Sequence, residues 1–358
     1  MSFADEDYPA VPYPGRRPPV SYVHDDATGW ELTPGPAASS GWCAEGRDLD
    51  DWLAARGASP LRDRVPLLCY GSNACPSKLT WLRDALGLRG PAVLFRARCT
   101  DIAAVWACGP RVVDDQRPAT LAALPGNTEH HAVWFATAEQ VAVLDRCEGR
   151  GERYRLARVD TGEVRLADGT VVDGPLAYVA AAPRRMPLLV GENSENDGKP
   201  VRCLDVPQSG AAALTGTPAS TDGLTVREIT GTPEPADFPG RVFVYGTLQP
   251  GASDWWRLEP HAAGNPRAAV VRGTLYDTGL GYPALQPGDG PGVPGWVVDL
   301  AEPAVALSTL DEYEGAEYLR VRVASPGGEP CWTYVWNGPV GGLSKLTGAW
   351  GTADPSRR

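Results

Sequence analysis

Lysine is scarce in this sequence, and positive charge as a whole is low. Of the 33 basic residues, only Lys78, Lys199 and Lys345 are lysines, and the others are arginines. The 44 acidic residues outnumber them and give a formal net charge of −11. The phosphates of nucleic acid repel a chain of this charge that has no basic stripe, so we expect no nucleic-acid partner. The preference for arginine over lysine, with abundant alanine, glycine and proline, indicates a bacterial source with a GC-rich genome.

Long apolar runs are also lacking. No stretch reaches the roughly 18 apolar residues of a membrane-spanning helix. The first residues, from Met1 to Asp7, lack the basic-then-apolar order of a secretory signal peptide. We therefore expect a cytoplasmic protein that does not bind membranes, while the sequence does not indicate an oligomeric state.

Several catalytic and cofactor motifs are missing as well. The eight cysteines form no Cys-x-x-Cys pair, and no histidine is placed to complete a zinc set. There is no phosphate-binding Gly-Lys-Ser/Thr loop, no Gly-x-Ser-x-Gly elbow and no His-Glu-x-x-His helix. Gly279 to Ala284 matches a dinucleotide fingerprint by letter, but Pro283 lies inside it and no βαβ unit follows. We therefore expect neither a metal nor a cofactor.

One pattern of strand, loop and acidic motif occurs twice. The hydrophobic strand and turn from Leu67 to Asn73 recurs from Val242 to Leu248. Each is followed by an acidic motif, Leu-Asp-Arg-Cys-Glu-Gly at 144–149 and Leu-Asp-Glu-Tyr-Glu-Gly at 310–315. The order of the two motifs is therefore the same in both halves of the chain.

The spacing within the pattern is also similar. Tyr70 precedes Glu148 by 78 residues, and Tyr245 precedes Glu314 by 69. Because two ordered motifs recur together, we interpret the chain as a tandem duplication. Its 358 residues suffice for two domains that each bury a core.

Composition gives the expected domain boundaries. Stretches rich in proline and glycine without periodicity predict an extended arm at the start and a linker in the middle. In order, we predict residues 1–60 as an extended N-terminal arm with a possible short helix, 61–208 as domain 1, 209–240 as the linker and 241–350 as domain 2. A segment around Val201 to Val206 is a further candidate for packing against a domain.

Hydrophobic periodicity predicts many strands and one principal helix in each domain. Thr137 can cap a helix that runs to Cys147 and ends at Gly149, and Glu302 to Tyr313 is the second helix. The expected strands are 102–106, 132–135, 154–159 and 176–179 in domain 1, and 242–245, 269–275, 295–300, 318–323 and 332–336 in domain 2. This composition favours α+β domains, each a small, mostly antiparallel barrel, over a doubly wound sheet.

Together the motifs resemble those of the gamma-glutamylcyclotransferase-like superfamily. The shared features are Tyr-Gly-Ser-Asn or Tyr-Gly-Thr-Leu after a strand, a distant Leu-Asp-x-x-Glu-Gly, and a strand beginning Tyr-x-x-x-x-Val. The second occurrence, which includes Tyr318, looks most like the gamma-glutamylamine cyclotransferase branch. The first, with Ser72 and Asn73, is closer to the branch that acts on gamma-glutamyl amino acids. The resemblance implies a barrel-like α+β fold and a small-molecule gamma-glutamyl substrate.

The two tetrapeptides are the expected binding loops. A glycine at a strand end lets the backbone turn tightly and approach a ligand closely. Consecutive N–H groups of such a turn can hold a carboxylate or a developing oxyanion, although a single turn of this kind is usually structural. The predicted substrate-binding residues are Tyr245, Gly246, Thr247 and Leu248, then Tyr70, Gly71, Ser72 and Asn73, and also Tyr282 and Tyr318.

Glu148 and Glu314 are the expected catalytic residues. Each precedes a glycine at the C-terminal end of a predicted helix. The partial negative charge of a helix end and burial in a pocket wall both raise the pKa of a carboxyl group toward the range of a general base or acid. Asp145, Asp311 and Glu312 are interpreted as solvated helix residues.

The expected reaction is an intramolecular acyl transfer. A gamma-glutamyl group carries its own amine near the amide carbonyl, so the enzyme only has to fold the substrate and move protons. The products would be 5-oxoproline and a free amine or amino acid. Two alternatives stay open: a non-catalytic tandem ligand-binding protein, and another acyl-transfer or amide-forming enzyme on the same scaffold. Asp254 stands where the amine branch commonly has asparagine, which would shift selectivity.

Overall fold

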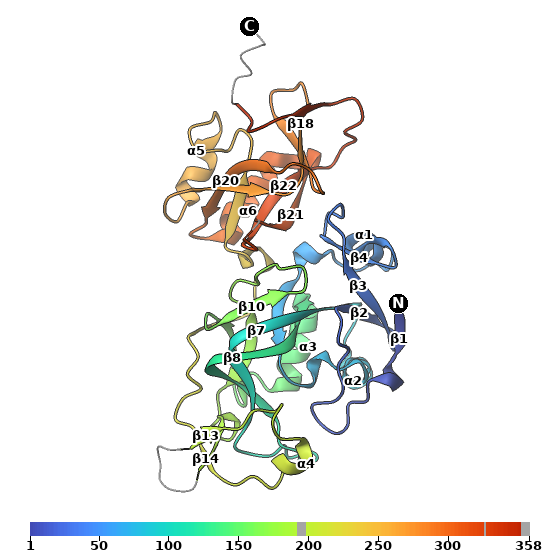
Figure 1. Ribbon diagram of the computed structural model, residues 1–358, viewed down its shortest axis with the longest axis vertical. Coiled ribbons are helices and arrows are strands. Elements are labelled where there is room, and N and C mark those ends of the chain that lie inside the picture. The colour runs from blue at the N-terminus through green and yellow to red at the C-terminus, as the bar shows by residue number, and fades with distance from the viewer. Residues whose placement is uncertain (192–197, 326, 352–358) are drawn as a thin grey trace. The chain divides into compact units, whose positions relative to one another are not determined.

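The computed structural model describes residues 1–191, 198–325 and 327–351. The chain divides into two compact units (Figure 1), each made of several segments of sequence. The first unit comprises Met1–Leu32, Arg56–Ser59 and Arg64–Pro233. The second comprises Thr33–Ala55, Pro60–Asp63 and the described residues from Glu234 onward.

The first unit is built mainly of strands. Its strands are β1 (Ser2–Ala4), β2 (Tyr22–Asp25), β3 (Thr28–Pro34, which continues into the second unit), β6 (Val65–Cys69), β7 (Ala92–Trp106), β8 (Ala119–Ala136), β9 (Tyr154–Val159), β10 (Glu163–Leu166), β11 (Leu176–Ala180), β12 (Leu188–Val190), β13 (Lys199–Pro200), β14 (Thr217–Pro218) and β15 (Val226–Glu228). Its α-helices are α2 (Pro76–Leu86), α3 (Ala138–Glu148) and α4 (Gln208–Ala211).

The second unit has a smaller set of elements. Its strands are β4 (Trp42–Ala44), β5 (Arg47–Asp48), β16 (Arg241–Val244), β17 (Arg267–Val271), β18 (Thr274–Asp277), β19 (Pro283–Gln286), β20 (Val293–Asp299), β21 (Tyr318–Ala324), β22 (Pro330–Trp336) and β23 (Ser344–Leu346). Its α-helices are α1 (Leu49–Ala54), α5 (Trp255–Leu258) and α6 (Pro303–Glu314).

The main sheets of the two units share one strand arrangement. In the first unit β6 pairs antiparallel with β8 and parallel with β11, and β11 pairs antiparallel with β9. In the second unit β16 pairs antiparallel with β20 and parallel with β22, and β22 pairs antiparallel with β21. Strands β7 and β17 then pair antiparallel with β8 and β20. The strand carrying the Tyr-Gly motif is therefore central in both sheets.

Neither sheet closes into the barrel that the strand count favoured. Among the described residues, the pairing of the second unit runs linearly as β17-β20-β16-β22-β21, and β19, β18 and β23 form a separate sheet. The strand expected at 269–275 breaks between β17 and β18. Gly273 has a φ of 154°, and a Cβ there would lie 2.6 Å from the Gln286 carbonyl oxygen. The chain uses this glycine to pass from one sheet to the other, and the sheet edges stay apart.

The two predicted helices are confirmed with their caps. The Thr137 side chain accepts from the Gln140 N–H at the start of α3, and Gly149 ends the helix in the left-handed conformation. Pro303 occupies the first turn of α6, where its missing N–H costs nothing, and Gly315 follows the last residue. Helix α2, with Pro76 in its first turn, was not predicted. Both predicted helices therefore end at the glutamates singled out in the sequence.

Residues predicted as an extended arm are partly folded into strands and a helix. Tyr22 in β2 is 2% exposed and lies opposite Leu94 of β7, so the segment extends the sheet of the first unit. The short helix is confirmed as α1, which buries Leu49, Trp52 and Leu53. Scattered aromatic residues give no periodic pattern, and for this reason the sequence did not predict these strands.

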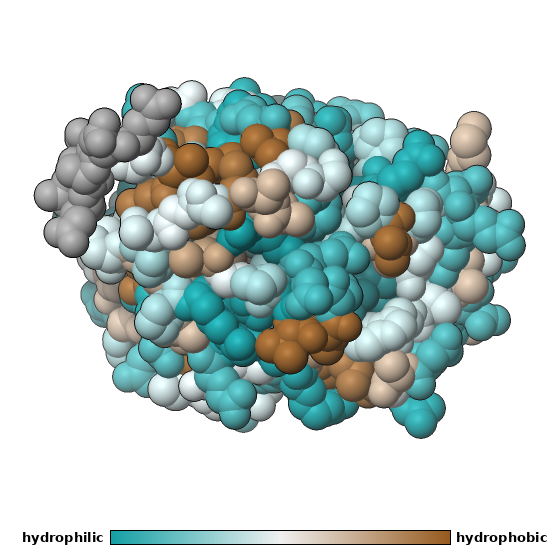
Figure 2. Space-filling model, turned by 90° about the horizontal axis from the view of Figure 1, so that it is seen from below, coloured by the Kyte–Doolittle hydropathy of each residue, from teal (hydrophilic) through white to brown (hydrophobic). Residues whose placement is uncertain are grey.

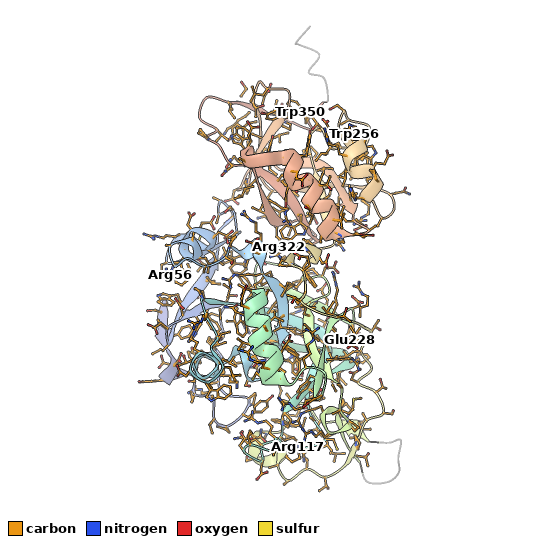
Figure 3. All side chains as sticks on the ribbon, turned by 180° about the vertical axis from the view of Figure 1, so that it is seen from behind. Arg56, Arg117, Glu228, Trp256, Arg322 and Trp350 are labelled. Carbon is orange, nitrogen blue, oxygen red and sulfur yellow. The ribbon has the colours of Figure 1, made fainter. Side chains whose placement is uncertain are left out.

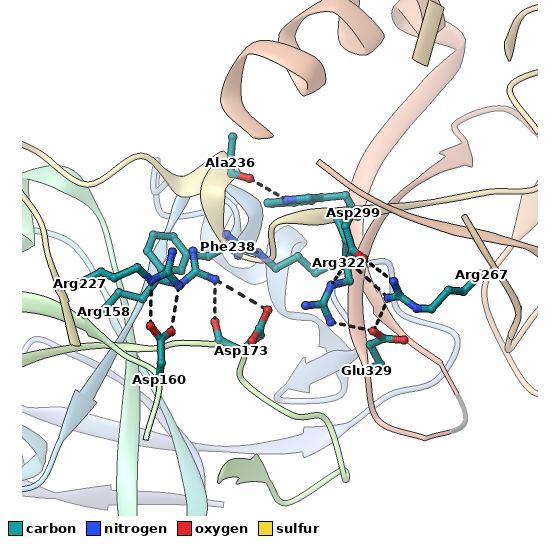
Figure 4. Close-up of polar contacts among 12 residues, drawn as sticks. Arg158, Asp160, Asp173, Arg227, Ala236, Phe238, Arg267, Asp299, Arg322 and Glu329 are labelled. Atoms are coloured by element: carbon teal, nitrogen blue, oxygen red, sulfur yellow. Dashed lines mark hydrogen bonds and ion pairs between the residues drawn. The ribbon is translucent and has the colours of Figure 1, made fainter. Parts of the chain in front are cut away.

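The predicted linker also contributes to the first unit. Strand β15 pairs antiparallel with β9, and Arg227 donates to Asp160 at 2.8 Å (Figure 4). The docked segment is confirmed, because the Trp106 N–H donates to the Val201 carbonyl and the Trp106 indole donates to the Val206 carbonyl. Arg117, labelled in Figure 3, is 7% exposed and donates to the carbonyls of α4 and the residues around it. The predicted linker and the docked segment before it are therefore held to the first unit by hydrogen bonds.

A buried arginine organises the second unit. Arg322 of β21 donates to the carbonyls of Leu61 and Phe238, at 2.5 and 2.6 Å, and its guanidinium lies over the Trp332 ring (Figures 3 and 4). Burial lowers the pKa of Arg322 to about 9. Carbonyl oxygens supply the polar contacts that a buried cation requires, so the segment Pro60–Asp63 is held in the second unit.

The surface carries separate apolar patches between polar groups, as one face shows (Figure 2). The most exposed large apolar residues include Val112 at 80% and Val113 at 85%. Within the described residues, no helix has the length and apolar character needed to cross a membrane.

Candidate functional site

The Tyr-Gly-Thr-Leu loop of the second unit forms one wall of a pocket. The cavity has a volume of about 170 Å³, which accommodates only a small chemical group. Its lining residues are Phe243, Val244, Tyr245, Gly246, Thr247, Leu248, Tyr282, Pro283, Tyr313, Glu314, Glu317, Tyr318 and Tyr334. All seven site residues predicted for the second occurrence are therefore brought together.

Gly246 is required by close approach. Its φ is not positive, but a Cβ at this position would lie 3.1 Å from Cγ and Cδ of Pro283. Pro283 begins β19, and it lines the same pocket. The absence of a side chain on Gly246 therefore lets the loop and β19 lie against each other.

A chain of hydrogen bonds connects the loop to the helix that carries Glu314. The Tyr245 hydroxyl donates to the Tyr334 carbonyl at 2.7 Å. The Tyr334 hydroxyl in turn donates to Asp311 Oδ1 at 2.8 Å and to the Leu307 carbonyl at 3.3 Å. Asp311 was predicted to be solvated, but it accepts from Tyr334 while remaining largely exposed. These contacts fix α6, and with it Glu314, relative to the loop.

Glu314 is a carboxyl group of this pocket whose pKa burial shifts strongly. It is the last residue of α6 and is partly buried. Burial, followed by the negative charges of Asp254 and Asp311, raises the pKa of Glu314 to about 8. Within the described residues, no hydrogen-bond donor contacts its carboxylate. A carboxyl group in this state can exchange a proton near neutral pH.

Aromatic side chains close the opposite wall. The Tyr318 hydroxyl donates to the Pro283 carbonyl at 2.8 Å, and the Tyr282 hydroxyl donates to Glu317 Oε2 at 2.8 Å. The Tyr318 ring meets the rings of Tyr282 and Trp336 edge to face, with centroids 6.2 and 5.4 Å apart. Tyr282 and Tyr318, predicted from separate motifs, thus form one surface.

The loop also presents unused backbone donors. Among the described residues, the N–H groups of Thr247 and Leu248 have no backbone or side-chain acceptor. The Thr247 hydroxyl lies 3.0 Å from the Tyr313 hydroxyl, which holds the loop in place. Two neighbouring N–H groups beside a buried carboxyl group are suited to hold an anionic or carbonyl oxygen.

The first unit positions its corresponding loop by the same contacts. The Tyr70 hydroxyl donates to the Tyr178 carbonyl, and the Tyr178 hydroxyl donates to Asp145 Oδ1 at 2.8 Å. Ser72 and Asn73 continue into a single 3-10 turn, residues Ser72–Ala74. Tyr178 and Tyr334 occupy equivalent positions in the two units, and the sequence did not single them out as site residues. The shared Tyr-Val pair in two predicted strands was the signal that could have found them.

Glu148 lies in a different environment from Glu314. The Asn73 side-chain N–H donates to Glu148 Oε1 at 2.8 Å. Burial raises the pKa of Glu148, whereas the Asn73 hydrogen bond and then the positive charges of Lys78 and Arg153 oppose the rise. Glu148 is therefore stabilised as a carboxylate by groups that have no counterpart beside Glu314.

A further tyrosine was missed by the sequence analysis. Tyr13 is 7% exposed, and its hydroxyl oxygen lies 2.7 Å from the position that a Cβ on Gly71 would take. No motif marked this residue, because it stands in the proline-rich start of the chain. The Tyr-Gly loop of the first unit is thus covered by a side chain from the predicted arm.

Part of the chain matches a known protein family. Residues 242–352 match the model of the family described as gamma-glutamyl cyclotransferase, AIG2-like. This range contains every predicted site residue of the second unit. No curated protein matches the chain.

Solved structures of this kind are similar to parts of the chain. Protein ytfP from Escherichia coli is 31% identical over 31% of this chain and 96% of its own, with a TM-score of 0.24. An AIG2-like protein from Mus musculus is 24% identical over 27% of this chain and 77% of its own, with a TM-score of 0.25. A gamma-glutamyl cyclotransferase is 19% identical over 33% of this chain and 66% of its own, with a TM-score of 0.27.

Proposed function

We propose that the protein is a cyclotransferase that acts on gamma-glutamyl amines at the pocket of the second unit. The family match at residues 242–352 supports this general class of reaction. The observation that carries the proposal is Glu314, a partly buried carboxyl group with a pKa of about 8 next to two unused backbone N–H groups. This combination supplies proton transfer and oxygen binding at one point.

The proposed reaction needs no side-chain nucleophile. Glu314 removes a proton from the α-ammonium of the gamma-glutamyl group, and the free amine attacks the γ-carbonyl carbon. The carbonyl oxygen becomes an oxyanion that the N–H groups of Thr247 and Leu248 stabilise. As the carbonyl re-forms, the bond to the departing nitrogen breaks, and Glu314 gives its proton to that nitrogen. The carboxylate then accepts the second proton from the ring nitrogen and releases it to the solvent. The products are 5-oxoproline and the free amine.

The pocket walls contribute by restricting the substrate. The Tyr245 and Tyr318 hydroxyls already donate to backbone carbonyls, so their rings act as fixed surfaces. A small pocket favours the folded conformation in which amine and carbonyl meet, and such pre-organisation lowers the barrier to ring closure. The small cavity fits the glutamyl part, with the departing amine directed toward the opening.

The two units are proposed to descend from one duplicated domain. Their central strands have the same neighbours in the same directions. The hydrogen bonds from Tyr70 to Tyr178 and from Tyr245 to Tyr334 are also the same. Contacts of this detail support a common origin more strongly than a single tetrapeptide does.

The proposal is tested by measuring 5-oxoproline release by mass spectrometry from a panel of gamma-glutamyl amines and gamma-glutamyl amino acids. Matched α-glutamyl isomers are the control, because their amide carbonyl is too close to the amine for a five-membered ring. We expect release from at least one gamma-glutamyl amine and from none of the isomers. Release from no member of the panel would reject the proposal, and binding without release would favour the non-catalytic alternative.

A further inference from the structure

The first unit contains the elements of a ligand site around Gly71, but a residue of the same unit lies in it. The Tyr13 hydroxyl oxygen is 2.7 Å from the ideal Cβ position of Gly71. Pro283, the residue nearest the equivalent position of Gly246, instead lies at 3.1 Å and forms a wall of an open pocket. The two glycines therefore face different neighbours.

The residues around Tyr13 match those that line the open pocket. Tyr70, Tyr154 and Glu148 lie close enough to influence the Tyr13 phenol or one another electrostatically, and Tyr245, Tyr318 and Glu314 are their equivalents in the second unit. Burial raises the Tyr13 pKa, so its phenol is neutral.

The loop of the first unit also has an unused polar atom. The Asn73 side-chain oxygen is buried and has no hydrogen-bond partner among the described residues. A buried acceptor without a partner is rare and is expected where a ligand completes the contact. The Asn73 side-chain nitrogen already donates to Glu148, so the free oxygen lies next to the proposed acidic group.

Tyr13 is held in place by contacts with four residues. Its hydroxyl accepts from the Ala119 N–H at 3.0 Å, and its own N–H donates to Gln116 Oε1 at 2.7 Å. Gln208, at the start of α4, donates to the Tyr13 carbonyl at 3.3 Å. The Arg111 guanidinium lies over the ring, 5.0 Å from its centroid. A side chain fixed by both its backbone and its hydroxyl is a specific occupant of this place.

We propose that Tyr13 is a built-in occupant of the first unit's site, and that a gamma-glutamyl ligand binds there only when the segment from Pro9 to Arg17 moves away. The choice of ligand rests on the proposed function. The second unit has no such occupant, because every residue lining its pocket lies between Phe243 and Tyr334. In this proposal the site of the second unit is open in the resting protein, and the site of the first unit is closed by Tyr13.

Tyr13 and the ligand compete for the same site, and this competition determines the apparent affinity of the first unit for the ligand. If the open form of the first site is a small fraction of the population, the apparent dissociation constant for a ligand is raised by the inverse of that fraction. A change that weakens the hold on Tyr13 increases this fraction and tightens apparent binding. A change just outside the segment that does not touch Tyr13 leaves the fraction unaltered.

The test counts binding sites for 5-oxoproline by calorimetry in the full-length Glu314→Gln protein, which cannot turn substrate over but retains its open pocket. We expect one site per chain in this parent protein and two after the additional change Tyr13→Ala. Tyr8→Ala is the matched control, since Tyr8 directly precedes this segment and packs against Phe3, with ring centroids 5.0 Å apart. It should leave one site.

Two further measurements check that the gained site is the one that Tyr13 occupies and that the result does not depend on a single variant. Phenol replaces the ring removed in Tyr13→Ala, so it should bind that variant and compete with 5-oxoproline at the gained site. Gln116→Ala removes one hydrogen bond to the Tyr13 N–H at a partly exposed position, and it should tighten apparent binding at the first site roughly 5-fold. This second variant decides the matter if Tyr13→Ala does not fold.

The outcomes separate this inference from the proposed function. No site in the parent but one in Tyr13→Ala would reject the gamma-glutamyl pocket of the second unit and keep the occupied first site. One site in both proteins would overturn the role of Tyr13. A gained site from which phenol does not displace 5-oxoproline would also overturn it, because the ligand would then lie elsewhere.

Discussion

The second unit keeps an open pocket at its Tyr-Gly loop, whereas the first unit fills the same place with Tyr13. The strand order around the two loops is alike, and so are the hydrogen bonds from Tyr70 and Tyr245. The two units differ in the chain segments that lie outside the shared strands. Tyr13, which precedes β6, lies against Gly71 of the first loop, and Gln208, which follows β11, donates to the Tyr13 carbonyl. The residues that line the pocket of the second unit all lie between Phe243 and Tyr334.

The surroundings of the two glutamates also differ. Glu148 accepts from Asn73 and lies near Lys78 and Arg153, whereas acidic side chains surround Glu314. Positive neighbours favour the carboxylate, and negative neighbours favour the protonated acid. Residues around the shared motif therefore oppose the rise in pKa that burial causes at Glu148 and add to it at Glu314.

The largest expected effect is the difference between the two Glu→Gln variants. Glutamine keeps the size of glutamate but cannot carry a proton, so Glu314→Gln should reduce 5-oxoproline formation by roughly two to four orders of magnitude. Glu148→Gln should change the rate by less than about 3-fold, because Tyr13 covers its loop. Steady-state kinetics on both folded variants provide the check.

Equal losses in these two variants would show that the units are coupled and would break the comparison. The double variant extends the same test. Full activity in the Glu148→Gln, Glu314→Gln protein would rule out the proposed proton transfer altogether.

A smaller but distinct contrast is expected for the two glycines. Gly246→Val places a branched side chain against Pro283 and should weaken ligand binding to the second unit by about tenfold or more, with the fold retained. Gly71→Val collides with the Tyr13 hydroxyl, so it should instead lower the free energy of unfolding by about 1–3 kcal/mol. Calorimetry and thermal denaturation separate the two effects. Loss of stability without loss of binding at Gly246 would argue against a ligand at this loop.

The motifs in the sequence were sufficient to predict the centre of each unit. The strand with the Tyr-Gly motif, the helix that ends at the glutamate and the strand that begins with Tyr154 or Tyr318 all follow from local patterns. Capping by Thr137 and the glycine after each helix are short-range signals that tertiary contacts do not override.

The sequence could not predict what covers the first loop. Tyr13 and Gln208 are 195 residues apart and meet only in the folded protein. Their neighbours are rich in proline and glycine, which usually predicts an extended chain. Strand β15 is likewise recognisable only by its pairing with β9. Isolated side-chain contacts of this kind leave no periodic signal.

The pH dependence of the two units should differ as well. Because the folded pKa of Glu314, about 8, lies above its ordinary value of 4.5, this residue contributes to stability below pH 4.5 and loses that contribution as the pH rises to about 8. The slope is at most about 1.4 kcal/mol per pH unit. Glu314→Gln should flatten the fall in melting temperature between these pH values. An unchanged profile in this variant would mean that Glu314 ionises normally.

The same ionisation should appear in catalysis. A general base acts in its deprotonated form, so kcat/KM for the gamma-glutamyl amine should rise with pH and level off above about 8. A rate that levels off near pH 5 would contradict this assignment of the base.

The smallest expected effect concerns Asp254, whose negative charge raises the pKa of Glu314. Asp254→Asn removes that charge and should lower the apparent pKa of the kcat/KM profile by roughly 0.5 units, as expected for a partly solvated charge pair. Glu312→Gln is the matched control, because Glu312 is an exposed carboxylate on α6, the helix that carries Glu314. Increasing the salt concentration should reduce the difference between Asp254→Asn and the parent protein, since screening weakens the interaction at this exposed edge. If both variants shift the profile equally, the effect belongs to net charge, and the acidic neighbours of Glu314 do not distinguish it from Glu148.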